Sequence, residues 1–419
     1  MNSYSQDALQ QLEAGKLDEF NQTFKLALSN DSDDLLFSLA EELYSLGFLD
    51  QAQQIYQQLL KKYPDEDELR ANLAEIAISE DQNDLALSYL SEIKPDSPSY
   101  VQSLMIAADL YQTQGLFEVS KQKLLAAKKL APDENVITFA LAELCFSMRE
   151  FDQAIPLYLN LIKQGITELS AVNLVERIGV AYANAGRFGH AIGYLKQIKL
   201  IDMTPDVKFE TAFTYLQLKE YKQAIAVFED LRDSDHDYPT LYPYLGEALE
   251  KLHKEKDALR VFQEGLGVDE YNETLWIKAG DVALKLGENQ QAEEYYRKGH
   301  HVAPDDLNLV IKLSNLLVQD EQYDDNIAFL NEYIKDHAVD PQLAWNLATS
   351  YAEEEDLEHA QTYYQLAAKS FDDQPDFLKE AALFYRSIGQ IDTMLPLLKK
   401  YLTIEPTDAD MDDIYREYH

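Results

Sequence analysis

Acidic residues recur at a fixed interval in this chain, in positions where they could bind a basic partner. They are spaced 34 residues apart within two groups, which are Glu41, Glu75, Asp109 and Glu143, and then Glu247 and Asp281. A row of carboxylates attracts Lys and Arg side chains and repels carboxylates. Acidic residues are 75 of 419, so composition alone places some of them at any repeated position. A binding ladder and a merely solvated face both remain open.

Aromatic residues flank two members of this acidic series at the same offsets. Phe37 and Tyr44 lie four residues before and three residues after Glu41, and Phe139 and Phe146 lie likewise around Glu143. Exposed rings beside carboxylates suit an extended or helical segment that carries Lys or Arg with apolar anchors. The alternative is that these rings pack between neighbouring helices.

Catalytic, metal-binding and cofactor motifs are absent from the sequence. It has no His-Glu-x-x-His, no glycine-rich phosphate loop and no Gly-x-Ser-x-Gly elbow. The single cysteine, Cys145, falls at a predicted core position and is expected to be a buried structural thiol. We therefore predict a protein that is not an enzyme, with no metal site and no cofactor.

The net charge of −39 limits the classes of partner. Such a surface repels nucleic acid and anionic membranes and attracts basic segments. One cysteine excludes an intramolecular disulfide, and no apolar run is long enough to span a membrane. The first residues have neither a basic start nor an apolar stretch. We expect a cytoplasmic protein without membrane insertion that binds proteins or peptides. The sequence neither supports nor excludes homo-oligomers.

Small and large residues alternate with the same period along the whole chain. Position 8 of each period is small in Ala8, Ala40, Ala74, Ala108, Ala142, Gly179, Ala212, Gly246, Gly280, Ser314, Ala348 and Ala382. Position 24 is large in Phe24, Tyr56, Leu90, Leu124, Tyr158, Leu195, Phe228, Phe262, Tyr296, Leu330, Tyr364 and Leu398. Two antiparallel helices that approach to roughly 8–10 Å need a small residue opposite a large one. The period therefore predicts stacked helical hairpins.

Helix ends also follow the period. Gly115 is expected to end one helix in the left-handed conformation. Position 18 carries Asp in six periods, where we expect the side chain to cap the second helix: Asp18, Asp50, Asp84, Asp152, Asp324 and Asp392. Position 20 is small except in Phe20, Asn326 and Met394, so packing there is expected to be less regular.

These residues resemble the tetratricopeptide repeat (TPR), in its stand-alone bacterial cytosolic form. Residues 101–134 match it through Ala108, Tyr111, Gly115, Leu124, Ala127 and Pro132. The resemblance implies an all-α fold, an α-solenoid that is a right-handed superhelix of about twelve helix-turn-helix units. It also implies that the acidic series and its aromatic neighbours line the concave groove.

The period slips between its two regular stretches, which predicts two arrays. We expect an N-terminal array at 1–168 with a degenerate first unit as cap, and a C-terminal array at 169–419 that ends in a short capping helix at 410–419. A hinge near 164–172 is one interpretation of the slip, and a neutral insertion is the other.

We predict a non-catalytic scaffold or adaptor that binds a basic or amphipathic segment in this groove. The alternative is a peptide-sensing regulatory protein that acts on a partner protein, although repeats that begin by Ala8 leave little room for an effector domain. Repeat domains that clamp a carboxylate need basic residues at position 5, where this chain has Phe37, Ala71, Met105 and Phe139. Only Lys379 and Arg386 form a basic pair on this face.

Overall fold

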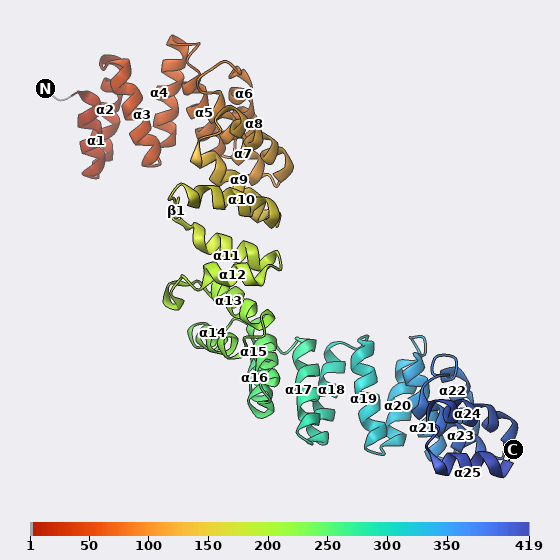
Figure 1. The fold of residues 1–419 in the computed structure, drawn as a ribbon. Helices are drawn as coiled ribbons and strands as arrows, with labels where there is room; N and C mark the ends of the chain where they lie inside the picture. The colour runs from red at the N-terminus through yellow and green to blue at the C-terminus, as the bar shows by residue number, and fades with distance from the viewer. Residues whose placement is uncertain (1–2, 419) are drawn as a thin grey trace. The chain divides into compact units, whose positions relative to one another are not determined.

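The computed structural model describes residues 3–418, and this part of the chain is almost entirely helical. It contains 25 α-helices and one small two-stranded sheet. Consecutive helices pair as antiparallel hairpins, and the second helix of most hairpins also packs on the first helix of the next. The prediction of an all-α, α-solenoid fold is confirmed. The chain divides after Asp202 into two compact units (Figure 1).

The first unit holds six hairpins. Its elements are α1 (Tyr4–Glu13), α2 (Leu17–Asn30), α3 (Asp33–Ser45), α4 (Leu49–Lys62), α5 (Asp67–Ser79), α6 (Asn83–Glu92), α7 (Tyr100–Thr113), α8 (Phe117–Leu130), α9 (Asn135–Ser147), α10 (Phe151–Lys163), β1 (Glu168–Leu169), β2 (Val172–Asn173), α11 (Leu174–Asn184), α12 (Phe188–Leu195) and the 3₁₀ turn η1 (Leu200–Asp202).

The second unit holds six hairpins and one further helix. Its elements are α13 (Pro205–Gln217), α14 (Tyr221–Ser234), α15 (Leu241–Lys251), α16 (Glu255–Val268), α17 (Glu273–Lys285), α18 (Asn289–Val302), α19 (Leu307–Gln319), α20 (Tyr323–Tyr333), α21 (Pro341–Glu353), α22 (Leu357–Ala367), α23 (Pro375–Ser387), α24 (Ile391–Ile404) and α25 (Ala409–Tyr418). None of the helices within residues 3–418 combines the length and apolar character needed to cross a bilayer.

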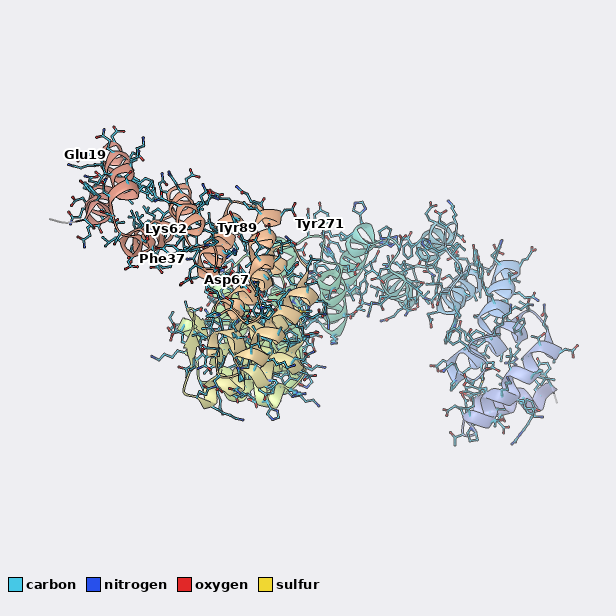
Figure 2. All side chains as sticks on the ribbon, turned by 90° about the horizontal axis from the view of Figure 1, so that it is seen from above. Glu19, Phe37, Lys62, Asp67, Tyr89 and Tyr271 are labelled. Atoms are coloured by element: carbon cyan, nitrogen blue, oxygen red, sulfur yellow. The ribbon has the colours of Figure 1, made fainter. Side chains whose placement is uncertain are left out.

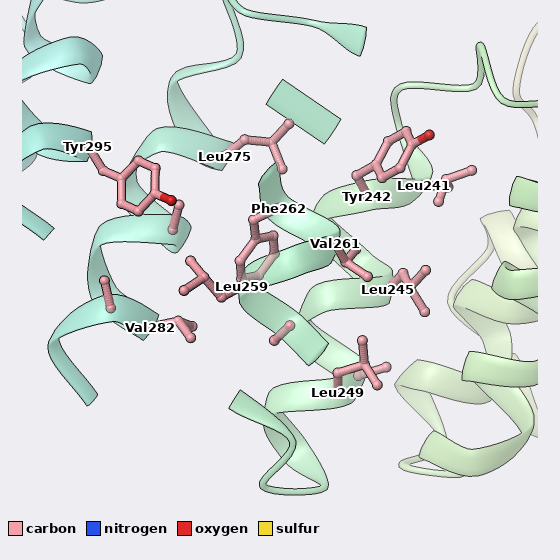
Figure 3. Close-up of a cluster of buried hydrophobic side chains, with 14 of the residues drawn as sticks. Leu241, Tyr242, Leu245, Leu249, Leu259, Val261, Phe262, Leu275, Val282 and Tyr295 are labelled. Carbon is pink, nitrogen blue, oxygen red and sulfur yellow. The ribbon is translucent and has the colours of Figure 1, made fainter. Parts of the chain in front are cut away.

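Every hairpin is closed by the predicted contact between a small and a large residue. All the residues at positions 8 and 24 are buried. A Cβ added to Gly246 of α15 would lie 2.0 Å from Phe262 of α16, and one on Gly280 would lie 2.3 Å from Tyr296. Figure 3 shows Phe262 among the other apolar side chains of this core, which continues through α13–α19. The helices of these hairpins can approach so closely only because position 8 carries no side chain.

The predicted C-terminal glycine of α7 is found in the structure, whereas the predicted N-terminal Asp caps are not. Gly115 has a φ of 73° after α7, as predicted. The prediction that the Asp residues cap the second helices was wrong, because α2 begins at Leu17 and α4 at Leu49, which places Asp18 and Asp50 inside the first turn. Their side chains make no cap hydrogen bond. A carboxylate in the first turn still interacts favourably with the helix dipole.

The slip in the period is a small β-hairpin between α10 and α11. Glu168–Leu169 pairs with Val172–Asn173, and Ser170 and Ala171 both have positive φ in the turn. The Asn173 side chain then caps α11 by accepting hydrogen bonds from two backbone amides. The boundary that we predicted at 168/169 lies within the first unit, and the hinge near 164–172 stays a prediction.

The large residues at position 20 are accommodated without exposure. Phe20, Asn326 and Met394 are all 0–1% exposed. Asn326 of α20 accepts a hydrogen bond from Ser314 and donates one to Ser350, at 2.8 Å each. A buried amide is stable only when its polar atoms are paired, and these partners come from the helices on either side, α19 and α21.

The last helix, α25, packs on α24 at the end of the second unit, and its role as a cap stays a prediction. Met411 of α25 is buried. Lys379 pairs with Asp408 at 2.8 Å, and Arg386 pairs with Glu417 at 3.0 Å. Hydrogen bonds from Lys379 and Tyr401 lower the pKa of Asp408 to about 2. The basic pair noted in the sequence is therefore neutralised by the segment that follows it. His419 lies outside the described residues.

The contact at Gly246 predicts a strong effect of one methyl group. We expect Gly246→Ala to lower the free energy of unfolding by about 1–3 kcal/mol, because Phe262 is fully buried and cannot move aside. Gly267→Ala is the matched control, since nothing lies within 4 Å of a Cβ there in helix α16, and it should leave stability unchanged or raise it slightly. Urea unfolding followed by circular dichroism measures both. Equal stability of the two variants would contradict the close contact.

Candidate functional site

The acidic series lies on the first helices of six hairpins, four in the first unit and two in the second. Glu41, Glu75, Asp109 and Glu143 are on α3, α5, α7 and α9, and Glu247 and Asp281 are on α15 and α17. Glu41 and Asp109 are exposed, and the other four are half-buried. Figure 2 labels Phe37 on α3 and Asp67 at the start of α5, the first helices of two neighbouring hairpins. The members of the series differ in what surrounds each carboxylate.

Glu143 is held by groups of its own protein. It accepts a hydrogen bond from the Tyr158 hydroxyl of the same hairpin and pairs with Arg177 of the next at 3.2 Å. The Arg177 guanidinium also lies over the Phe146 ring, 4.8 Å from its centroid. Burial and the Glu143 carboxylate both raise the pKa of Tyr158, which keeps the hydroxyl protonated as a donor. This carboxylate therefore joins two hairpins.

Asp281 repeats this arrangement in the second unit. Its Oδ1 atom accepts from the Tyr296 hydroxyl at 2.6 Å and from Lys312 at 2.8 Å. Glu247 has no such hydroxyl because its hairpin carries Phe262 at position 24. Lys278 lines the same surface depression as Glu247, together with the pair formed by Lys285 and Glu250. All three of these acidic positions have a base close by.

One residue of the following hairpin differs between the two groups of carboxylates, and it is the base that pairs with Glu143 and with Asp281. Position 6 of the next first helix is Arg177 after Glu143, Lys278 after Glu247 and Lys312 after Asp281. The same position is Asn72 after Glu41, Ile106 after Glu75 and Ala140 after Asp109. Within residues 3–418, no ion pair involves Glu41, Glu75 or Asp109. The residue types at position 6 can be read from the sequence. That position 6 faces the carboxylate of the preceding hairpin becomes evident only from the packing of successive first helices.

Two of the carboxylates without a base, Glu75 and Asp109, interact electrostatically with each other and with Tyr44. We name Phe37, Glu41, Tyr44, Glu75 and Asp109 the acidic patch. Burial raises the pKa of Glu75, and the charge of Asp109 adds to the increase while a hydrogen bond from Gln102 opposes it. Burial also raises the pKa of Tyr44, with further increases from Glu75 and Asp109. The charge of Asp109 thus raises the cost of ionising Glu75, and a cation bound there would lower that cost.

The four aromatic residues of the predicted site differ in their burial and in the side chains that they contact. Phe37 is half-buried, with its ring 5.8 Å from the buried ring of Tyr56, and Tyr44 is half-buried on the same helix. Phe139 is buried and Phe146 packs against Phe151 and Arg177. Phe37, Tyr44 and Phe146 are thus all half-buried, and Phe37 and Tyr44 pack against the buried residues of α1–α5. Phe139 lies in the interior, and Phe146 lies in the cluster that holds Glu143.

The remaining reactive side chains have structural surroundings. Cys145 is 1% exposed, and burial raises the pKa of its thiol, which fits the predicted structural role. Across the described part of the chain, no group of three or more His, Cys, Asp or Glu residues is arranged to hold a metal ion.

Comparison with known proteins identifies the family. The TPR repeat-containing protein YpiA of Bacillus subtilis is 32% identical over 415 residues, which span 99% of this chain and 97% of that protein. This chain belongs to the YpiA-like tetratricopeptide repeat proteins. Models of YpiA-like repeats match residues 112–166 and 341–408, and a general tetratricopeptide repeat matches 273–305. The family that the residues resembled is confirmed.

More distant relatives share parts of the chain. Tetratricopeptide repeat protein 21A of Mus musculus is 24% identical over 231 residues, 52% of this chain and 17% of that protein. The crystal structure of YrrB, described as a TPR protein with an unusual peptide-binding site, covers 45% of this chain at 18% identity with a TM-score of 0.39. The repeats of this YpiA-like protein mark it as a protein-interaction scaffold, and proteins of this family are generally non-catalytic.

The two kinds of carboxylate predict opposite effects of neutralisation. Glu75→Gln should slow amide hydrogen exchange in α5 at pH 7, because it removes a charge that burial disfavours. The raised pKa of Glu75 means that this gain shrinks as pH falls through it, since the native side chain is then neutral too. Glu143→Gln should lower the local stability of α9 and α10 by about 1–2 kcal/mol, because Arg177 loses its charged partner. Amide hydrogen exchange in these two helices should therefore become faster. Equal effects of the two changes would contradict the distinction.

Proposed function

We propose that this protein is a scaffold that binds a basic segment of a partner protein on the acidic patch of its first unit. The observation that supports this proposal most directly is that, among the described residues, Glu41, Glu75 and Asp109 form no ion pair, whereas Glu143 and Asp281 each pair with a base of the next hairpin. A partner's Lys or Arg side chains would supply the missing countercharges. Phe37 and Tyr44 would receive the apolar parts of those side chains or a neighbouring anchor.

The energetics favour a segment that engages several carboxylates together. A single exposed ion pair contributes about 0–1 kcal/mol. Three carboxylates on successive hairpins give more, because a bound cation relieves the repulsion between Asp109 and Glu75 as well as forming pairs. Long-range attraction from a chain of net charge −39 would also speed association with a basic partner. Affinity and association rate should both fall as salt rises.

The acidic patch predicts the outcome of a charge-reversal experiment. Glu41, Glu75 and Asp109 are changed together to Lys, and partners captured from native cytosol by the full chain are identified by mass spectrometry. The partner that carries a basic segment should bind the triple variant at least tenfold more weakly in calorimetry. Its affinity for the unaltered chain should decrease with increasing salt.

The control variant makes the same change in net charge away from the patch. Asp65, Glu118 and Asp133 are exposed residues at hairpin ends, and their change to Lys should leave capture and affinity unchanged. If both triple variants weaken binding equally, overall charge is responsible and the acidic patch is not the site. If the variant with Lys at Glu41, Glu75 and Asp109 still binds every partner of the unaltered chain, the proposal is wrong.

A further inference from the structure

A second surface of the first unit is created by the early end of one helix. Helix α6 has ten residues, whereas the second helices α2, α4 and α8 have fourteen. It ends at Glu92 because Pro95 has no amide hydrogen to donate and disfavours a helical conformation at Lys94 before it. Helix α6 contacts α7 less extensively than the longer helices α4 and α8 contact α5 and α9.

The uncovered surface is an apolar groove between α6, α7 and α8. Leu87 and Leu90 line it from α6, Ile93 from the segment after α6, and Leu104 and Ala107 from α7. The buried side chains of α7 divide here between two separate clusters. Ala107 packs toward α5 and α6, while Leu104 packs with Ala127 and Ile137. The groove therefore lies where the apolar core of the unit is interrupted.

The polar side chains of this groove carry one ammonium and four hydroxyls, and the hydroxyls can donate as well as accept. Lys123 of α8 is the one charged residue that lines it, together with Tyr100 and Tyr111 of α7. Among the described residues, none forms an ion pair with Lys123. The nearby Lys121, in contrast, pairs with Glu150. An apolar groove with an unpaired ammonium and two phenolic hydroxyls at its edge is complementary to apolar side chains that lie beside a carboxylate.

We propose that this groove binds an amphipathic helix of a partner protein that presents two apolar side chains one turn apart and an adjacent Asp or Glu. A helix fits because α6 is about one turn shorter than α4 and α8 and contacts the helix that follows it less extensively than they do. Its apolar side chains would pack between Leu90 and Leu104, and its carboxylate would pair with Lys123. This site takes an acidic segment, so it differs in both location and charge preference from the acidic patch and does not depend on it.

The test uses a random-peptide display library selected on the full chain and, in parallel, on Ser91→Trp. Ser91 is an exposed residue of α6 that lines the groove, so a tryptophan there fills it without entering the core. Peptides enriched on the unaltered chain alone should carry apolar residues at i and i+3 or i+4 next to an acidic residue. Enrichment that is equal on both proteins would overturn the proposal, as would no enrichment on either.

An enriched peptide is then measured by fluorescence anisotropy against two charge reversals. Lys123→Glu should weaken its binding at least tenfold, whereas Lys129→Glu, an exposed change on the same helix outside the groove, should change it less than twofold. The triple Lys variant of the acidic patch should bind it as the unaltered chain does, which separates this proposal from the first. Equal effects of Lys123→Glu and Lys129→Glu would contradict it. A concentration-dependent dimer abolished by Ser91→Trp would assign the groove to a second copy instead.

Discussion

The close approach of two helices within each hairpin is the constraint on which the rest of this structure depends. Where Gly246 faces Phe262, the backbone of one helix lies against the ring of the other, with no room for a methyl group. Because small residues recur opposite large ones with the period of the sequence, the hairpins share this construction, and the second helix of most hairpins packs on the first helix of the next. Equivalent positions on successive first helices consequently form rows on one surface, and a row is what allows a repeat protein to bind an extended partner.

The acidic residues of this series have two different kinds of surroundings. Glu143 and Asp281 are used internally, since each is bound by a tyrosine of its own hairpin and a base of the next. Glu41 and Asp109 are not bound in this way. An ion pair between neighbouring hairpins fixes their contact but removes a charge from the surface, so the same position cannot both join hairpins and attract a partner. At Glu143 and Asp281, the residue at position 6 of the following hairpin supplies the base of this ion pair.

The departures from the period have local physical causes that differ from one another. Pro95 shortens α6 and opens a groove, whereas the insertion at 168–173 folds into a β-hairpin that leads into the cap of α11. Asn326 occupies a place that is usually small, and it is satisfied by hydrogen bonds to the helices on both sides. A repeat array tolerates such exceptions because each hairpin contacts only its neighbours, which keeps the effect of each exception local.

The sequence by itself determined the fold, since the spacing of Ala40 and Tyr56, or of Gly280 and Tyr296, is a local property that a helical hairpin satisfies in one way. It also determined the family and the buried state of Cys145. It could not place the caps within one residue, because Asp18 is as favourable in the first turn as before it. Only the tertiary structure decided which carboxylates lack a countercharge and which aromatic rings are buried. Those properties depend on contacts between hairpins, such as the ion pair of Arg177 with Glu143. The pattern of residues within one hairpin does not specify such a contact.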